Sequence, residues 1–276
     1  MYADINGLKM FYEIRGASDP VKVPLVLLHG AISATGTSFG PLPDLLAQTR
    51  QVIAVEQQGH GRTADIDRPM SVQAMADDTL ALLARLGIGQ ADLFGYSLGA
   101  GIALNIITRH PTTVRKAVLA SVTYDKSGFH PEMFGGPEPG ESADAPGNHL
   151  RVPLEQEYQA LAPDPGHWPA LLAKVQAMEL PEITPQVIAA TSVPILLIIG
   201  DSDIVTPEHA VAMFRLLGGG VLGDLTPMPA TQLAVLPGTS HIGITSRADM
   251  LMTMIPPFLD ASRSQPGDEA TAMRQE

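Results

Sequence analysis

Apolar stretches of two kinds alternate along the chain. Short continuous apolar runs predict strands buried on both faces, and segments with an apolar residue every three or four positions predict helices. The predicted strands lie at 24–28, 52–56, 92–94, 116–122, 193–200 and 233–236, and the predicted helices at 39–48, 72–86, 98–110, 207–217 and 248–259. A hairpin with strands at 2–5 and 8–14 precedes them. This alternation predicts an α/β protein whose mostly parallel sheet is covered by helices on both faces.

The alternation stops between residues 125 and 185, where proline, glycine and acidic residues become frequent. A helix at 168–178 is the clearest element within this stretch. Insertions longer than ~15 residues are usually functional. We therefore predict that 125–185 forms an inserted cap, or lid, on a core made of 1–124 and 186–261. Residues 262–276 have little to bury and are predicted to be a disordered tail.

Composition limits the cellular locations and the binding partners that can be expected of the protein. The chain has 276 residues, a net charge of -12 and no cysteine. The negative charge argues against nucleic acid and anionic membranes as partners. The absence of cysteine excludes disulfides, thiolate metal sites and cysteine nucleophiles. No apolar run reaches the ~20 residues that span a bilayer, and no signal-peptide pattern is visible. A cytoplasmic location is therefore expected.

One predicted strand ends in Gly95-Tyr96-Ser97-Leu98-Gly99, which matches the G-x-S-x-G nucleophile elbow. A serine on a tight turn between strand and helix projects its hydroxyl above the sheet edge, and only glycine tolerates the close contacts on either side. The helix that follows directs its positive end, and the amide of Leu98, toward the group that the hydroxyl attacks. Ser97 is therefore the candidate nucleophile.

A serine nucleophile needs a base, because its hydroxyl is hardly ionised at neutral pH. His241 is the best placed of the eight histidines, since it lies in the turn predicted between the last strand and the last helix, at the same sheet edge as Ser97. His209 falls inside a predicted helix and is expected to face solvent.

The imidazole needs a carboxylate that holds its tautomer and stabilises its charged form. Asp201 and Asp203 both follow the strand predicted at 193–200. Asp201 is the better placed to cap the turn, and Asp203 lies further out, where its loop could reach His241. Composition does not separate the two.

The oxyanion that develops during acyl transfer needs two positioned amides. Leu98 supplies one. The loop after the strand at 24–28 is expected to supply the other, with Ala31 as the donor. His29, which begins this loop, is expected to support it by hydrogen bonding.

Together with His29-Gly30, Gly59-His60-Gly61-Arg62 and Gly238-Thr239-Ser240-His241, these motifs make the sequence resemble the α/β-hydrolase superfamily. The closest resemblance is to its capped serine esterases and cofactor-free haloperoxidases. It implies the α/β-hydrolase fold with a lid, the chain order Ser, Asp, His, and no metal or organic cofactor. In this family the acid lies three residues after the glycine that ends its strand, which selects Asp203 over Asp201.

Two departures from the family pattern carry information. Many relatives have an aspartate before the Gly-x-Gly turn, where this chain has Glu56-Gln57-Gln58. Glu56 is expected to hold the turn as a structural acid. Related epoxide hydrolases and haloalkane dehalogenases place aspartate at the elbow, so Ser97 argues against both activities.

The expected activity is hydrolysis of a carboxylic ester of a small to medium apolar substrate through an acyl-serine intermediate. The same residues would serve a cofactor-free perhydrolase, a lactonase or a carbon–carbon bond hydrolase, and the sequence does not separate these. A receptor that binds a ligand without turnover is a more distant alternative. The apolar residues expected to line the pocket are Ile32, Val205 and Ile242 from the core, and Met133, Phe134, Trp168 and Met178 from the lid.

Overall fold

The computed structural model describes residues 1–19, 21–134, 148–180 and 182–262. The predicted tail therefore lies outside the described residues apart from residue 262, and so do residues 135–147 and 181 of the predicted lid. No helix of the described part is long and apolar enough to cross a bilayer.

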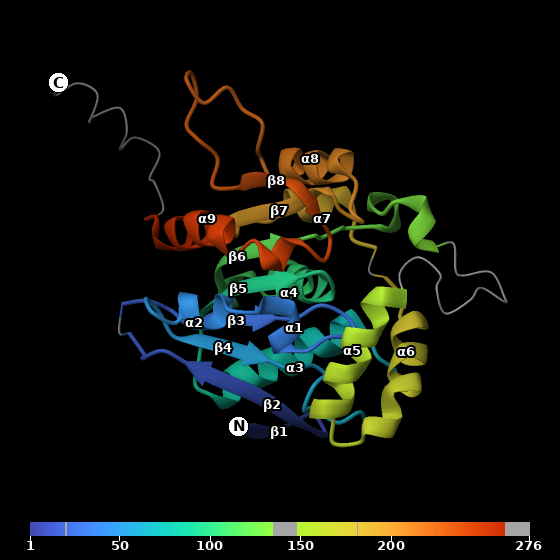
Figure 1. Cartoon of the computed structure of the whole chain (residues 1–276). Helices are drawn as coiled ribbons and strands as arrows, with labels where there is room; N and C mark the ends of the chain where they lie inside the picture. Colours follow the sequence, from blue (N-terminus) through green and yellow to red (C-terminus); the bar gives the residue numbers. More distant parts are fainter. Residues whose placement is uncertain (20, 135–147, 181, 263–276) are drawn as a thin grey trace.

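The described chain is built on an eight-stranded sheet in the order β1-β2-β4-β3-β5-β6-β7-β8 (Figure 1). The pairs β1–β2 and β2–β4 are antiparallel, and every other neighbouring pair is parallel. The strands are β1 (Tyr2–Ile5), β2 (Leu8–Arg15), β3 (Leu25–Leu28), β4 (Val52–Val55), β5 (Ala91–Tyr96), β6 (Val114–Ala120), β7 (Ile195–Ser202) and β8 (Gln232–Ser240). The predicted α/β class with a mostly parallel sheet is confirmed.

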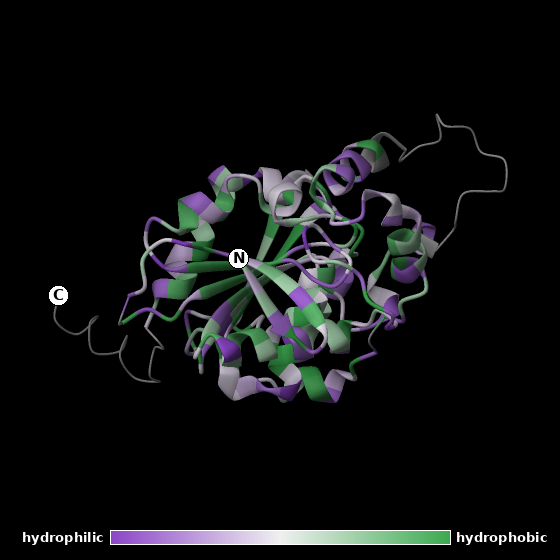
Figure 2. Cartoon of the chain, turned by 90° about the horizontal axis from the view of Figure 1, so that it is seen from below, coloured by the Kyte–Doolittle hydropathy of each residue, from purple (hydrophilic) through white to green (hydrophobic). Residues whose placement is uncertain are grey.

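Helices cover both faces of this sheet, and Figure 2 shows the largely hydrophobic strands between two helical layers. One face carries α3 (Val72–Arg85), α4 (Leu98–Arg109) and α8 (Pro207–Leu216), and the other carries α1 (Thr35–Phe39), α2 (Leu42–Leu46) and α9 (Ala248–Asp260). All residues of β3 and β4 are buried, because each strand is covered on both sides.

Between β6 and β7 the chain forms α5 (Asn148–Leu161), α6 (Trp168–Gln176) and α7 (Pro185–Ala189). Figure 1 shows α5 and α6 together beside the sheet, at the edge where the parallel strands end. The helix predicted at 168–178 corresponds to α6. The helix α5 is not evident from the sequence, because Pro153 lies inside it and proline normally ends a helix.

Three expectations about these elements are wrong. The helix predicted at 39–48 is shorter, since only α2 at Leu42–Leu46 lies within it, and Gly40, with a φ of +50°, separates α2 from α1, which ends at Phe39. The last strand runs to Ser240 instead of ending at 236, so residues 237–240 belong to the strand, and His241 lies in the turn that follows it. His209 is only 6% exposed, since its ring stacks on Tyr124 with centroids 4.2 Å apart.

Candidate active site

Ser97 lies between β5 and α4 in a strained turn. Its φ of +54° and ψ of -117° fall in a region that residues other than glycine rarely adopt. A Cβ atom at Gly95 would lie 2.3 Å from the carbonyl oxygen of Gly99, and one at Gly99 would lie 1.9 Å from that of Leu28. The Ser97 N–H donates to the carbonyl of Ala120 over 2.9 Å, which ties the turn to β6. Both glycines are therefore required by close approach of the backbone.

His241 joins the hydroxyl of Ser97 to the carboxylate of Asp203. Ser97 Oγ lies 3.1 Å from His241 Nε2, and His241 Nδ1 lies 2.9 Å from Asp203 Oδ1. In this arrangement Nδ1–H donates to the carboxylate, which leaves Nε2 able to accept the serine proton. The structure thus brings together the three residues selected from the sequence.

The carboxylate of Asp203 is buried and surrounded by donors. Its Oδ1 accepts the N–H of Ile204 over 2.7 Å, and its Oδ2 accepts the N–H of Gly200 over 3.2 Å. Burial by itself raises the pKa of Asp203, but hydrogen bonds from His241, Ser121 and Gly200 outweigh it and hold the pKa below its usual value. The group is therefore ionised at neutral pH.

Asp201 has a different set of partners. It lies within β7 and not beyond it, because the strand extends to Ser202. Its Oδ2 accepts the N–H of Gly238 over 2.7 Å and its Oδ1 accepts the N–H of Thr239 over 3.0 Å. These bonds from β8 lower the pKa of Asp201. Asp201 therefore holds β8 to β7, whereas the sequence predicts that it caps the turn after its own strand.

Two further residues contact His241, and sequence reasoning missed both. Ser121 follows β6 with a φ of +57°, and its Oγ donates to Asp203 Oδ1 over 2.8 Å and lies 2.7 Å from His241 Nδ1. The Tyr96 hydroxyl donates to the His241 carbonyl over 3.1 Å, and the two rings stack with centroids 5.1 Å apart. The sequence offered one indication of Ser121, which is its position. It follows β6, the strand that neighbours β5, and Ser97 follows β5.

The two predicted oxyanion donors lie on neighbouring elements. Leu98 is the first residue of α4, so its N–H has no acceptor within the helix. Ala31 lies in the loop after β3, and β3 pairs with β5 in the sheet. The loop and the elbow therefore leave the sheet side by side.

His29 supports this loop as predicted. Its Nδ1–H donates to the carbonyl of Gly30 over 2.8 Å, and its Nε2 accepts the N–H of Gln57 over 3.0 Å. Complete burial, with His60 nearby, lowers the pKa of His29 to about 3, so its ring is neutral.

Glu56 holds the Gly-x-Gly turn, also as predicted. Its Oε2 accepts the N–H of Arg62 over 2.6 Å, and its Oε1 pairs with the Arg62 guanidinium over 2.8 Å. Burial raises the pKa of Glu56, and these contacts with Arg62 oppose that rise.

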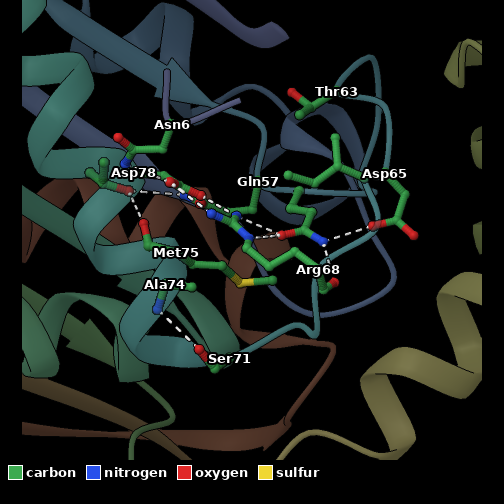
Figure 3. A network of polar contacts seen from close by, with 12 residues as sticks. Asn6, Gln57, Thr63, Asp65, Arg68, Ser71, Ala74, Met75 and Asp78 are labelled. Atoms are coloured by element: carbon green, nitrogen blue, oxygen red, sulfur yellow. Dashed lines mark hydrogen bonds and ion pairs between the residues drawn. The ribbon is translucent and has the colours of Figure 1, made fainter. Parts of the chain in front are cut away.

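A polar network lies beyond this turn, around Arg68 and Asp78 (Figure 3). Arg68 pairs with Asp78 over 2.6 Å and donates through Nε to Gln58 over 2.8 Å. Gln58 donates to Asp65 over 2.8 Å, and Lys174 of α6 pairs with Asp65 over 2.6 Å. The loop after β4 is therefore fastened to α6.

The core residues predicted to line the pocket have three different environments. Val205 is fully buried beside Ile199 and Ala210. Ile242, next to His241 in the chain, is 47% exposed. Ile32 is half-buried with a φ of +51°.

The lid residues predicted for the pocket are placed only in part. Trp168 is 4% exposed and packs on Tyr158, with ring centroids 5.4 Å apart, so it contributes to the contact between α5 and α6. Met178 is half-buried against the main core. The backbones of Met133 and Phe134 belong to a 3-10 turn, but their side chains lie outside the described residues. Within the described part, no group of three or more His, Asp or Glu side chains could hold a metal ion.

Comparison with known proteins agrees with this fold. The model of the alpha/beta hydrolase family matches residues 25–251, which is most of the chain. The chain belongs to this family and is a hydrolase.

The similar proteins include hydrolases with different substrates. A pimeloyl-[acyl-carrier protein] methyl ester esterase of Neisseria meningitidis is 26% identical over 94% of this chain and 84% of its own length. The putative carbamate hydrolase RutD of Rhizobium rhizogenes is 32% identical, but the match covers 40% of this chain and less than half, 42%, of the relative. The solved meta-cleavage product hydrolase of Pseudomonas fluorescens has a TM-score of 0.75 at 17% identity, covering 94% of this chain and 96% of its own, and shows the shared fold.

Proposed function

We propose that this protein is a serine hydrolase that cleaves carboxylic esters of small to medium apolar substrates. The observation that carries the proposal is the continuous contact from Ser97 Oγ through His241 to Asp203, with distances of 3.1 and 2.9 Å. Membership of a hydrolase family, with an ester-cleaving relative across most of the chain, supports it.

The first half of the proposed reaction forms an acyl-serine. Ser97 Oγ attacks the acyl carbon while His241 Nε2 takes the hydroxyl proton, and Asp203 stabilises the resulting imidazolium. The oxyanion of the tetrahedral intermediate accepts hydrogen bonds from the amides of Ala31 and Leu98. The intermediate then collapses, and the alkoxide leaves as an alcohol with the proton from Nε2.

The second half releases the acid. His241 Nε2 removes a proton from a water molecule, whose oxygen attacks the acyl carbon of the acyl-serine. The same two amides bind the second oxyanion. Ser97 Oγ leaves with the proton that Nε2 returns, which restores the free enzyme.

We also infer that 125–185 is the lid that sets the size of the substrate, on a core formed by 1–124 and 186–261. The support is that α5 and α6 bind the loops after β3 and β4, at the sheet edge where open α/β sheets bind ligands. A panel of esters varied separately in acyl and alcohol length tests this inference. Truncating Trp168 to Ala is expected to change the chain-length preference.

The decisive experiment is steady-state turnover of p-nitrophenyl acetate and butyrate by the wild type, Ser97→Ala and His241→Ala. Both substitutions are expected to lower kcat by ~10⁴-fold or more, because nucleophile and base act as one unit. Circular dichroism checks that each variant is folded. Full activity in Ser97→Ala would refute the mechanism.

The same assay separates the alternatives. A wild type that binds esters without turnover would indicate a receptor. Peracid formation that needs hydrogen peroxide, or faster cleavage of a lactone or of a carbon–carbon bond in a diketone, would move the assignment to the corresponding activity of the same three residues.

A further inference from the structure

The helix α5 places a carboxylate on the loop that follows β3. Oε2 of Glu157 accepts the N–H of Ala34 over 3.1 Å, and Oε1 accepts the N–H of Thr37 over 3.0 Å. The contact joins residues more than 100 positions apart. Glu157 is half-buried, and a Cβ atom at Gly36 would lie 3.2 Å from its Oε1. The carboxylate therefore lies directly against this turn.

The loop that Glu157 contacts is strained. Ile32 has a φ of +51°, a conformation that is unfavourable for a β-branched residue and costs ~1–3 kcal/mol. Such a conformation persists only where the surrounding contacts enforce it. Ile32 directly follows Ala31, the predicted oxyanion donor, so the direction of the Ala31 amide depends on those contacts.

Two serine hydroxyls next to the amides that Glu157 binds form hydrogen bonds with Gly30, at the start of the loop. Ser38 Oγ accepts the N–H of Gly30 over 3.0 Å, and Ser33 Oγ donates to the carbonyl of Gly30 over 2.9 Å. The two hydroxyls lie 2.7 Å apart. Ser33 precedes Ala34 and Ser38 follows Thr37, so Glu157 fixes the segment from which both hydroxyls reach Gly30.

We propose that Glu157 is a positioning residue that holds the oxyanion loop in its active shape from the inserted segment. The inference rests on the proposed ester hydrolysis. A carboxylate that accepts two amides makes charge-assisted hydrogen bonds, which are stronger than neutral ones. Glu157 thereby fixes the turn that anchors Gly30, and the Ala31 amide keeps its direction toward the oxyanion.

If Glu157 served only to hold the inserted segment in place, loosening that segment elsewhere would have the same effect on kcat. The chain offers a matched control for this possibility. Lys174 of α6 makes the second tether of the same segment, 2.6 Å from Asp65 and 2.8 Å from the carbonyl of Ile66. That tether lies on the loop after β4, which carries neither predicted oxyanion donor. Lys174→Met loosens the segment without touching the loop after β3.

The experiment compares full-length wild type, Glu157→Gln, Glu157→Ala and Lys174→Met. It measures kcat and KM for p-nitrophenyl butyrate, inhibition by a trifluoromethyl ketone that adds to the serine as an oxyanion, and the melting temperature. Loss of a whole oxyanion donor costs ~100- to 1,000-fold in kcat, so a misdirected donor in Glu157→Ala is expected to cost ~10- to 100-fold. KM should change little, and inhibition should weaken by the factor lost from kcat.

Glu157→Gln keeps an acceptor for one amide and is expected to fall between wild type and Glu157→Ala; it also serves if the alanine variant does not fold. Lys174→Met should lower the melting temperature while kcat stays within ~3-fold of wild type. Equal effects of Glu157→Ala and Lys174→Met on kcat, or a loss confined to KM, would overturn the inference with ester hydrolysis intact. A wild type without ester turnover would instead refute the proposed function, and the inference with it.

Discussion

His241 is oriented by contacts on three sides. Asp203 and Ser121 face its Nδ1, the Tyr96 ring stacks on its imidazole, and the Tyr96 hydroxyl binds its backbone carbonyl. A side chain fixed in this way has already lost the rotamer freedom that a reaction would otherwise have to remove. The orientation of His241 is thus determined by residues from three different strand ends.

The two aspartates provide a matched test of this orientation. Asp203→Asn is expected to lower kcat/KM for p-nitrophenyl butyrate by ~10³- to 10⁴-fold, because a neutral amide neither holds the tautomer nor stabilises the imidazolium. Asp201→Asn is expected to retain most of the activity, since its carboxylate binds β8 amides. An inactive Asp201→Asn beside an active Asp203→Asn would reverse the assignment of the acid.

At the residue scale, the sequence predicts those residues whose chemistry requires one amino-acid type at one position of a motif. Ser97, His241 and Asp203 belong to this kind. Ser121 and Glu157 do not, because serine and glutamate are common and their contacts span more than 80 positions in the chain. Their roles depend on the packing of distant segments.

Among the elements, the junction of β5 and α4 is the most tightly constrained. The backbone of α4 approaches β3 so closely at Gly99 that the Leu28 carbonyl occupies the place of a side chain. The backbone is strained at Ser97 and at Ser121, which follow the adjacent strands β5 and β6. Packing of the helices on the sheet is what maintains both.

Two glycines of α4 allow the effect of a close backbone contact on stability to be distinguished from the effect of helix propensity. Gly99→Ala is expected to destabilise the protein by several kcal/mol, because a Cβ atom would lie 1.9 Å from the Leu28 oxygen. Apart from its chain neighbours and the backbone of its own helix, no atom lies within 4 Å of the ideal Cβ position of Gly101, so Gly101→Ala is expected to stabilise the protein by about 1 kcal/mol. Urea denaturation measures both changes. A destabilised Gly101→Ala would show that α4 is constrained along its whole first turn.

The hydrophobic pattern predicts the elements of the sheet well, since burial on both faces leaves a strong signal. It fails where local geometry decides. The break between α1 and α2 depends on one glycine with positive φ, and α5 continues past Pro153. The end of β8 is set by pairing with β7, which adds Pro237 to Ser240 to the strand.

Across the whole molecule, the stability of the fold is linked to pH by buried histidines, among which His29 and His60 have the largest shifts in pKa. His29 and His60 are fully buried with ring centroids 5.1 Å apart. Burial lowers the pKa of His29 from 6.5 to about 3 and that of His60 from 6.5 to about 4. Below about pH 6.5 the unfolded chain therefore binds two protons that the folded protein excludes.

Unfolding free energy is accordingly expected to decrease as pH falls from 6.5 toward 4, by about 1.4 kcal/mol per pH unit for each histidine. Urea denaturation between these pH values measures the slope. His60→Gln should remove about half of this contribution. An identical slope in His60→Gln and wild type would contradict the assignment.

The position of Trp168 has a practical consequence. The chain contains one tryptophan, and that side chain is buried between α5 and α6. Its intrinsic fluorescence therefore reports on the inserted segment alone, while far-ultraviolet circular dichroism reports on every helix and strand. The protein carries a built-in optical probe, free of any label, for the moment at which this segment separates from the sheet.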